Sequence, residues 1–147
     1  MTIKELYSEL LKYRDIMELN PPVASNIISA YEKHNGINLP NEFKKLLMCF
    51  NGGEIFIPGT IIYGLNSDKS EYSINTINRL KDLYSIPNSF LIIGKLNFGD
   101  LICLDLCGSD CVVQWDHENN EEFYRWDSLC DWLNETIEDY QAYSEGD

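Results

Sequence analysis

In the first third of the chain, apolar residues recur every three or four positions, a period that predicts helices. Residues 3–18 carry such a stripe, and the Asn-Pro-Pro sequence at 20–22 should end it, because proline cannot continue a helix. A second helix is expected to begin near residue 22 and to end at 35–36, where glycine can adopt a left-handed cap. A third helix is expected over 39–50, closed by two consecutive glycines.

Beyond residue 53 the apolar pattern approaches the two-residue period of strands. Strands are predicted at 54–57, 60–63, 90–93, 100–106, 111–115 and 122–125, with a short helix at 74–84. A last helix is expected to begin at Ser128, which starts a Ser-x-x-Asp capping signature, and the tail 141–147 is expected to be frayed. Strands joined by short hairpins favour an antiparallel sheet. The predicted fold class is therefore α+β, with the sheet packed against helices in a single domain over residues 1–147.

The composition agrees with a packed globule, since 44% of the 147 residues are hydrophobic. No apolar run approaches the roughly 20 residues that span a bilayer, and the charged N-terminus does not resemble a signal peptide. Five cysteines without a secretion signal are interpreted as reduced thiols. We therefore expect a cytoplasmic protein that does not bind membranes.

The charge is unevenly distributed along the chain. The formal net charge is −13, and residues 110–147 carry twelve carboxylates against one base, Arg125. Carboxylates gathered at one end of a folded domain make a negatively charged surface, which repels nucleic acid and attracts basic proteins. Nucleic-acid binding is disfavoured directly, because a pI near 4.4 lacks the basic footprint that phosphate contacts require. The alternative is that these acids only keep a small protein in solution.

Two sets of possible metal ligands do not match known site patterns. Cys103, Cys107 and Cys111 are evenly spaced, but they lie on a predicted strand–loop–strand and lack the paired knuckles of a zinc site. The acids of 116–127 fall at alternate positions as in a calcium loop. That loop needs glycine at its sixth position, where Glu121 stands. No metal and no cofactor is predicted.

Enzyme motifs are also missing from the sequence. There is no phosphate-binding glycine loop, no dinucleotide fingerprint and no HExxH, and no nucleophile signature surrounds any cysteine. No catalytic residue is predicted. A small hydrolase that uses a pair of carboxylates stays open as the less favoured alternative, since such a pair would need a desolvated acid.

Short motifs that can each be explained by local structure occur in a distinctive order. They are Leu39-Pro40-x-x-Phe43, Asn51-Gly52-Gly53-Glu54, Ile86-Pro87 with Leu91-Ile92-Ile93-Gly94, Gly99-Asp100-x-Ile102-x-Leu104-Asp105, Val112-Val113-x-Trp115-Asp116-His117-Glu118, and Ser128-Leu129-x-x-Trp132-Leu133. In this order they resemble the SMI1/KNR4 family, also called the SUKH superfamily, over roughly residues 22–134. Leu129 departs from the family pattern, in which phenylalanine is frequent.

Structural roles suffice to explain these motif residues. Asp100 can bond backbone donors in the turn that follows Gly99. Ile102 and Leu104 alternate with other residues as in a half-buried strand. Trp115 is expected in the core, because its indole can bury a large area.

The resemblance implies a curved antiparallel sheet and a function without catalysis. Short bacterial members of the family are similar to immunity proteins, which bind and neutralise secreted toxins, many of them nucleases. Fungal members resemble signalling scaffolds. The resemblance carries no catalytic residues to this sequence.

We therefore predict a non-enzymatic immunity protein that binds a basic partner, a cognate toxin, through an acidic surface that contains aromatic residues. The residues expected to bind the partner are Asp110, Asp116, Glu118, Glu121, Glu122, Tyr124 and Trp126. The open alternatives are a scaffold that binds a cellular protein, and aromatics that belong to the core beneath a solvated acidic rim. The sequence does not indicate an oligomeric state.

Overall fold

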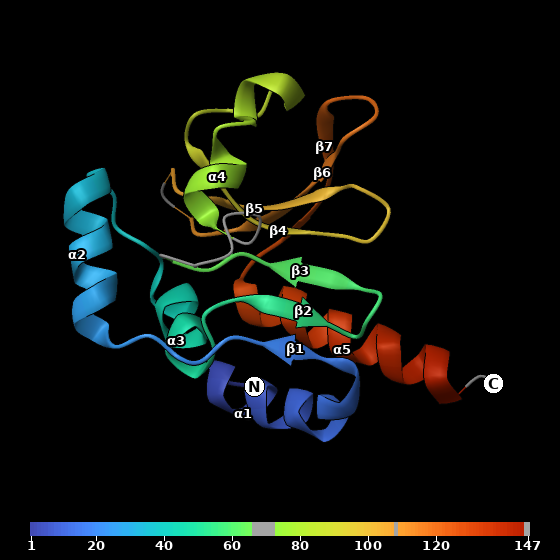
Figure 1. Ribbon diagram of the computed structural model, residues 1–147. Helices are drawn as coiled ribbons and strands as arrows, with labels where there is room; N and C mark the ends of the chain where they lie inside the picture. The colour runs from blue at the N-terminus through green and yellow to red at the C-terminus, as the bar shows by residue number, and fades with distance from the viewer. Residues whose placement is uncertain (66–72, 108, 146–147) are drawn as a thin grey trace.

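The computed structural model describes residues 1–65, 73–107 and 109–145, and the statements below concern these residues (Figure 1). In chain order the elements are α1 (Ile3–Leu10), the 3-10 helix η1 (Leu11–Ile16), β1 (Glu18–Leu19), α2 (Ser25–Asn35), α3 (Asn41–Cys49), β2 (Gly53–Ile55), β3 (Thr60–Ile62), α4 (Ile74–Asn78), the 3-10 helix η3 (Lys81–Tyr84), β4 (Phe90–Lys95), β5 (Leu101–Asp105), β6 (Val112–Asp116), β7 (Glu121–Trp126) and α5 (Leu129–Glu145). The seven strands form one open sheet in sequence order, so β1 and β7 are its edges. Each neighbouring pair is antiparallel. The predicted α+β class is confirmed.

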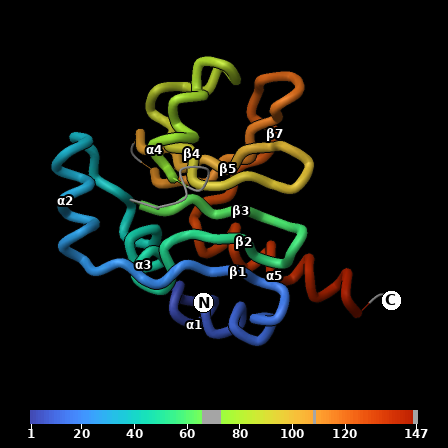
Figure 2. Tube along the Cα trace, viewed as in Figure 1, coloured from blue at the N-terminus to red at the C-terminus, as the bar shows by residue number. Residues whose placement is uncertain are grey.

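The sheet is curved, and helices lie on both sides of it. In Figure 2 the β6–β7 hairpin points in a different direction from β1, β2 and β3. Register shifts at Ile92/Gly94 and at Gln114/Trp115 mark bulges, which increase local twist. Helices α1, α3 and α5 contact one another, whereas α4 contacts β4. The sheet thus separates a larger helical layer from a smaller one.

The core follows the apolar stripes that the sequence shows. Phe43, Leu46, Leu47 and Phe50 are all buried, and Leu39 and Pro40 just before α3 are buried with them. Asn51 then ends this helical region, with positive φ at both Gly52 (76°) and Gly53 (140°). A side chain on Gly53 would meet the Glu18 carbonyl oxygen at 2.2 Å, so glycine lets β1 and β2 approach.

Asn51 also ties two distant segments together inside the core. Its side-chain amide donates to the Leu65 carbonyl oxygen at 2.6 Å, and its Oδ1 accepts from the Leu65 backbone N–H at 2.7 Å. Both residues are buried, so each bond satisfies a group that water does not reach.

The N-terminal prediction needs two corrections. The first helix ends at Leu10 rather than at residue 18, because Tyr13 takes a non-helical conformation inside η1, and residues 18–19 pair with β2. The second helix begins at Ser25, after Pro22, and this start buries Ile28 and Tyr31 while Ile27 is exposed. Its predicted end is confirmed, since Gly36 forms a left-handed cap with φ of 65°.

Two further expectations differ from the structure. Strand β5 is not half-buried: Leu101 to Leu104 are all buried, because helices cover both faces of the sheet here. Within the described part of the expected tail, the last helix continues through Glu145 instead of fraying from residue 141, and residues 146–147 lie outside the described ranges. Tyr140 stacks on Phe56 at a ring-centroid distance of 4.2 Å and meets Tyr13 edge-on, which anchors the final turns.

Candidate functional site

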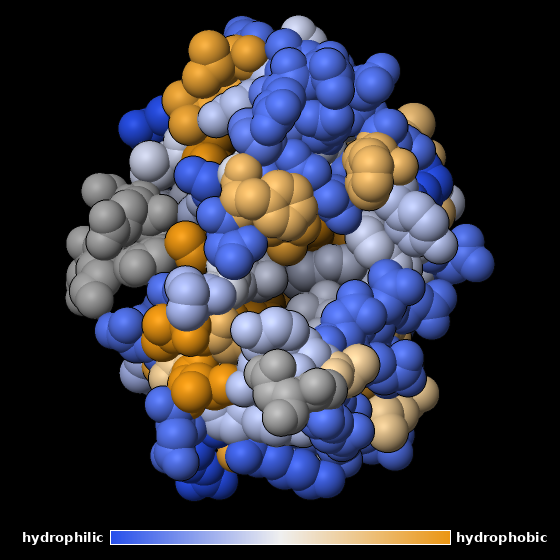
Figure 3. All heavy atoms as spheres, turned by 90° about the vertical axis from the view of Figure 1, so that its right-hand side faces the viewer, coloured by the Kyte–Doolittle hydropathy of each residue, from blue (hydrophilic) through white to orange (hydrophobic). Residues whose placement is uncertain are grey.

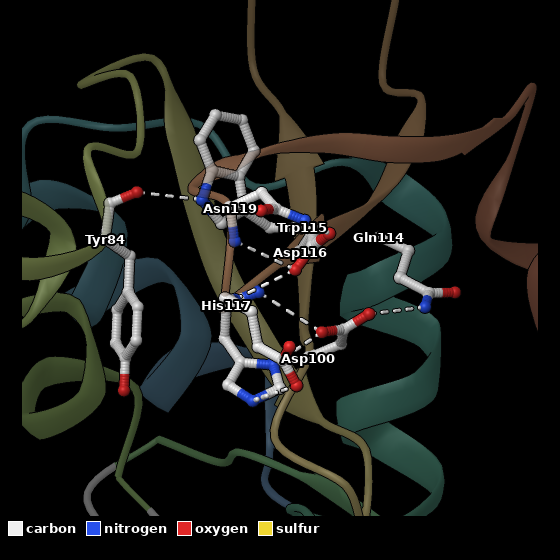
Figure 4. A network of polar contacts seen from close by, with 8 residues as sticks. Tyr84, Asp100, Gln114, Trp115, Asp116, His117 and Asn119 are labelled. Atoms are coloured by element: carbon white, nitrogen blue, oxygen red, sulfur yellow. Dashed lines mark hydrogen bonds and ion pairs between the residues drawn. The ribbon is translucent and has the colours of Figure 1, made fainter.

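A buried carboxylate holds the start of β5 to the end of β6. Asp100 is 6% exposed, and its Oδ2 accepts a hydrogen bond from the Gln114 side-chain amide at 2.8 Å. Its Oδ1 accepts from the His117 backbone N–H at 3.2 Å and lies 2.6 Å from His117 Nδ1. A carboxylate can only accept, so Nδ1 carries the proton in this contact. Figure 4 shows Asp100 between the His117 ring and Gln114.

Asp116 organises the turn that connects β6 to β7. Its Oδ1 accepts from the backbone N–H groups of Glu118 (2.9 Å) and Asn119 (3.2 Å), and its Oδ2 accepts from the Asn119 side chain at 2.9 Å. These hydrogen bonds stabilise the charged form and lower the pKa of Asp116. Asp116 therefore acts as a turn-forming residue.

Close packing against the His117 ring explains why position 99 is a glycine. A Cβ atom at Gly99 would lie 2.8 Å from His117 Nε2, and the φ of 109° at this position favours glycine. The expectation that the Asp100 side chain bonds backbone donors in its own turn is wrong. Asp100 instead bonds Gln114 and His117, because the sheet brings the start of β5 beside the end of β6.

Asp100, Asp116 and His117 each offer one possible metal-ligand atom, and these atoms lie within 4.8 Å of one another. The oxygen atoms of both carboxylates already accept hydrogen bonds from the surrounding protein. These contacts account for the cluster as a structural network. It fixes the β6–β7 hairpin, and with it the position of the edge strand.

Trp115 supports the same hairpin from the other side of the sheet. It is 7% exposed, its Nε1–H donates to the Tyr84 carbonyl oxygen at 2.8 Å, and its ring meets Phe90 edge-on. Burial agrees with the core position expected for this residue. Figure 4 shows the indole pointing toward Tyr84.

Strand β7 presents different chemistry on its two faces. On the face of Trp115, the Arg125 guanidinium lies over the Phe90 ring and bonds both Glu122 (2.7 Å) and Asp105 (2.9 Å). These two carboxylates raise the pKa of Arg125. On this face one cation is thus shared by two carboxylates, so part of the negative charge is compensated.

The opposite face of β7 carries aromatic residues beside α5. Tyr124 pairs with Gln114 and is 52% exposed, and its ring meets Trp126 edge-on at 4.7 Å. The Trp126 Nε1–H donates to Glu135 Oε2 of α5 at 2.7 Å. This bond joins the edge strand to the last helix.

Further carboxylates continue from this contact along α5. Asp131, Glu138 and Asp139 lie three or four residues from Glu135, so the four side chains share one side of the helix. Partial burial, together with the charges of Glu135 and Glu138, raises the pKa of Asp139. We call this the β7–α5 surface; it comprises Tyr124, Trp126, Asp131, Glu135, Glu138 and Asp139.

The structure brings together only part of the predicted partner-binding set. Tyr124 and Trp126 share the α5 side of β7, and Glu121 has the same orientation at the far end of the strand, paired with Asp116. Glu122 points to the other face and is ion-paired.

The remaining members of that set lie at the two ends of the β6–β7 hairpin. Asp110 precedes β6 with φ of 54°, at the Trp126 end. Asp116 and Glu118 lie in the turn at the other end, where the Glu118 side chain is 79% exposed.

Glu135 and its neighbours on α5 are absent from the predicted site. Their spacing of three and four residues within a predicted helix was the available signal. Within residues 110–145 as described, Glu122 is the one carboxylate that pairs with lysine or arginine. The negative charge of this region is thus largely uncompensated.

Figure 3 views the side of the molecule on which the chain ends. Hydrophilic side chains dominate this face, and hydrophobic ones appear in separate groups. The exposed aromatic residues of β7 are Phe123 (66%) and Tyr124 (52%).

The buried carboxylate and two of the thiols are poor candidates for catalytic groups. Within the part of the chain that the structure describes, Asp100 is the only buried carboxylate; its oxygen atoms accept hydrogen bonds from His117 and Gln114, and the Asp116 carboxylate, within 4.8 Å of it, is bonded to its own turn. Burial raises the pKa of the Cys103 thiol to about 12, and burial with the nearby Glu42 carboxylate raises that of Cys130 to about 12. Such thiols are poor nucleophiles at neutral pH.

Together, the open curved sheet and the flanking helices define an α+β protein. Residues 22–135 match the SMI1 / KNR4 family (SUKH-1), and the chain belongs to this family. The resemblance drawn from the ordered motifs is confirmed.

A crystal structure of a protein from Pseudomonas syringae pv. tomato has a similar fold, with a TM-score of 0.69 and 16% sequence identity. The similarity covers 89% of this chain and 95% of that one. No curated protein sequence matches this chain significantly. None of the helices in the described ranges is long and apolar enough to cross a membrane.

Proposed function

We propose that this protein is a non-enzymatic immunity protein that neutralises a cognate toxin in the cytoplasm by binding it through the β7–α5 surface. Membership in the SMI1/KNR4 family supports the class of function. The free state of all five cysteines agrees with a reducing compartment. The observation that carries the proposal is the placement of unpaired carboxylates around two aromatic residues at one edge of the sheet.

The aromatic pair supplies the apolar part of the surface. Tyr124 is half exposed, while Trp126 is held in place by Glu135 and by the Tyr124 ring. Aromatic side chains that are already fixed lose little conformational entropy on binding. Residues of this type are the common anchors of protein interfaces.

The carboxylates supply attraction and selectivity for a basic partner. Asp131, Glu135, Glu138 and Asp139 form a row, and the pKa of Asp139 is raised by partial burial and, in addition, by repulsion from Glu135 and Glu138. A lysine- or arginine-rich partner relieves this repulsion when it binds. If the partner is a nuclease, the row would occupy the basic site that otherwise holds phosphates. The nucleic acid itself is repelled by the same charge.

A co-expression experiment tests this proposal. The reading frames beside the gene are first searched for a toxin-like protein, which is then expressed in cells together with the wild-type protein; co-expression should restore growth. A variant with Glu135→Gln and Glu138→Gln should protect less, since two of the attracting charges are removed. The matched control, Asp15→Asn with Asp82→Asn, removes two exposed charges elsewhere and should protect as well as wild type.

Two results would contradict the proposal. Equal protection by the β7–α5 variant and the wild type would remove the acidic surface from the mechanism. A gene without a toxin-like neighbour, together with stable binding of a housekeeping protein, would favour the scaffold alternative.

A further inference from the structure

A groove along α1 lies at the β1 edge of the sheet, the edge opposite β7. It consists of two hollows of about 360 and 440 Å³ that share Cys49 at their boundary. The first lies between α1, η1 and the segment after β1, and the second lies between the start of α1 and the end of α3. The groove therefore follows α1 from its first residues into η1.

Apolar side chains line much of this groove. Tyr7, Leu11 and Met17 line the first hollow, and Ile3 and Met48 line the second. Met48 is 44% exposed, although Phe43, Leu46 and Leu47 of the same helix are buried. Burial raises the pKa of the Cys49 thiol, which keeps it neutral and adds it to the apolar wall.

The charged residues of the groove are all basic. Arg14 lines the first hollow, Lys4 and Lys45 line the second, and neither hollow is lined by an aspartate or glutamate. In a chain with 24 acidic and 11 basic residues, this grouping is the reverse of the overall charge.

These three cations also have no carboxylate partner within the described ranges. Arg14 uses only its Nε–H, which donates to the carbonyl oxygen of Leu11 one turn earlier. The acids nearby on α1 are already engaged: Glu5 caps the helix at Thr2, and Glu9 pairs with Lys12 at 3.0 Å. The groove thus offers unpaired cations beside an apolar surface.

We propose that this groove binds a segment of another protein that carries carboxylates and apolar side chains on one face. Apolar contacts with Tyr7, Leu11 and Met48 would supply the buried area, and Lys4, Arg14 and Lys45 would pair with the carboxylates. A second copy of this chain is the less suitable occupant, because two molecules of net charge −13 repel one another.

This inference goes beyond the proposed function, because it assigns a second surface of opposite charge at the opposite edge of the sheet. The chain can then hold an acidic segment and a basic partner at the same time.

The test uses two labelled peptides and fluorescence anisotropy with the full chain. One peptide is a 16-residue amphipathic helix with leucine on one face and glutamate on the other, and the second replaces every glutamate by glutamine, so that it is not a basic ligand for the β7–α5 surface. The acidic peptide should bind the wild-type chain more tightly. The double variant Lys4→Glu/Lys45→Glu should lose about fivefold or more of this affinity, since two attracting charges become repelling ones.

A matched variant, Lys33→Glu/Arg79→Glu, reverses two exposed charges outside the groove and should bind the acidic peptide as the wild type does. Met48→Asp, a substitution of an exposed apolar residue of the groove, should also weaken binding of the acidic peptide. Circular dichroism checks that each variant is folded. Equal affinity for both peptides, or equal loss in the matched variant, would overturn the proposal. A concentration-dependent dimer that Lys4→Glu/Lys45→Glu abolishes would instead assign the groove to a second copy.

Discussion

The Asp100 network gives the sharpest test of how the β6–β7 hairpin is held. Asp100→Ala removes an acceptor that serves three donors: the Gln114 amide, the His117 backbone and the His117 ring. Hydrogen bonds to a charged group contribute about 1.5–3 kcal/mol each when fully buried. Gln114 and His117 are only half-buried, so water can replace part of each bond. About 1 kcal/mol per bond gives a loss of about 3 kcal/mol in the free energy of unfolding.

Asp100→Asn should lose less, about 1 kcal/mol, because its amide oxygen still accepts from His117. Urea unfolding followed by tryptophan fluorescence measures both losses. Amide hydrogen exchange should quicken across β6 and β7 in the alanine variant before it does elsewhere. Asp15→Ala removes an exposed carboxylate as a control and should stay within about 0.5 kcal/mol of wild type. A loss in Asp100→Ala no larger than in this control would refute the reasoning.

Three further predictions concern the core, the thiols and the acidic helix. Asn51→Ala should destabilise by about 3–4 kcal/mol in urea unfolding, because it leaves the buried N–H and C=O of Leu65 unpaired. Iodoacetamide at pH 8 should label exposed Cys107 before buried Cys103, whose pKa is raised to about 12, and mass spectrometry of the peptides reads the order. Asp139→Asn should stabilise at pH 7 by a few tenths of a kcal/mol, because like charges on one helix face repel. The pKa of Asp139 is raised in the folded state, so its destabilising effect develops as pH rises through that pKa, and thermal unfolding at pH 3 should show no gain.

The fold class was accessible from the sequence because local signals agree with the final structure. The apolar stripe of α3 is buried as predicted, and the glycine cap of α2 has the expected left-handed conformation. The predictions that failed concern segments whose structure depends on contacts with residues distant in the sequence. Tyr13 leaves the helix where its ring meets Phe56 and Tyr140, and no local pattern reports those partners.

The candidate site shows the same limit more clearly. Simple alternation along β7 would place Glu122, Tyr124 and Trp126 on one face. The bulge opposite Gln114 and Trp115 turns Glu122 to the other face, where it pairs with Arg125. A one-residue change of register moves a side chain across the sheet, and the sequence does not mark where the bulge falls.

The central claim is that a basic toxin binds at the β7–α5 surface, and its affinity for the chain tests this most directly. Isothermal titration calorimetry of the toxin domain identified by co-expression is run at 50 and 150 mM NaCl, with wild type, Glu135→Gln/Glu138→Gln and the Asp15→Asn/Asp82→Asn control. The account predicts that the first variant binds roughly five- to thirtyfold more weakly, that this difference shrinks at higher salt, and that the control matches wild type. Equal affinities for all three proteins at both salt concentrations would contradict it.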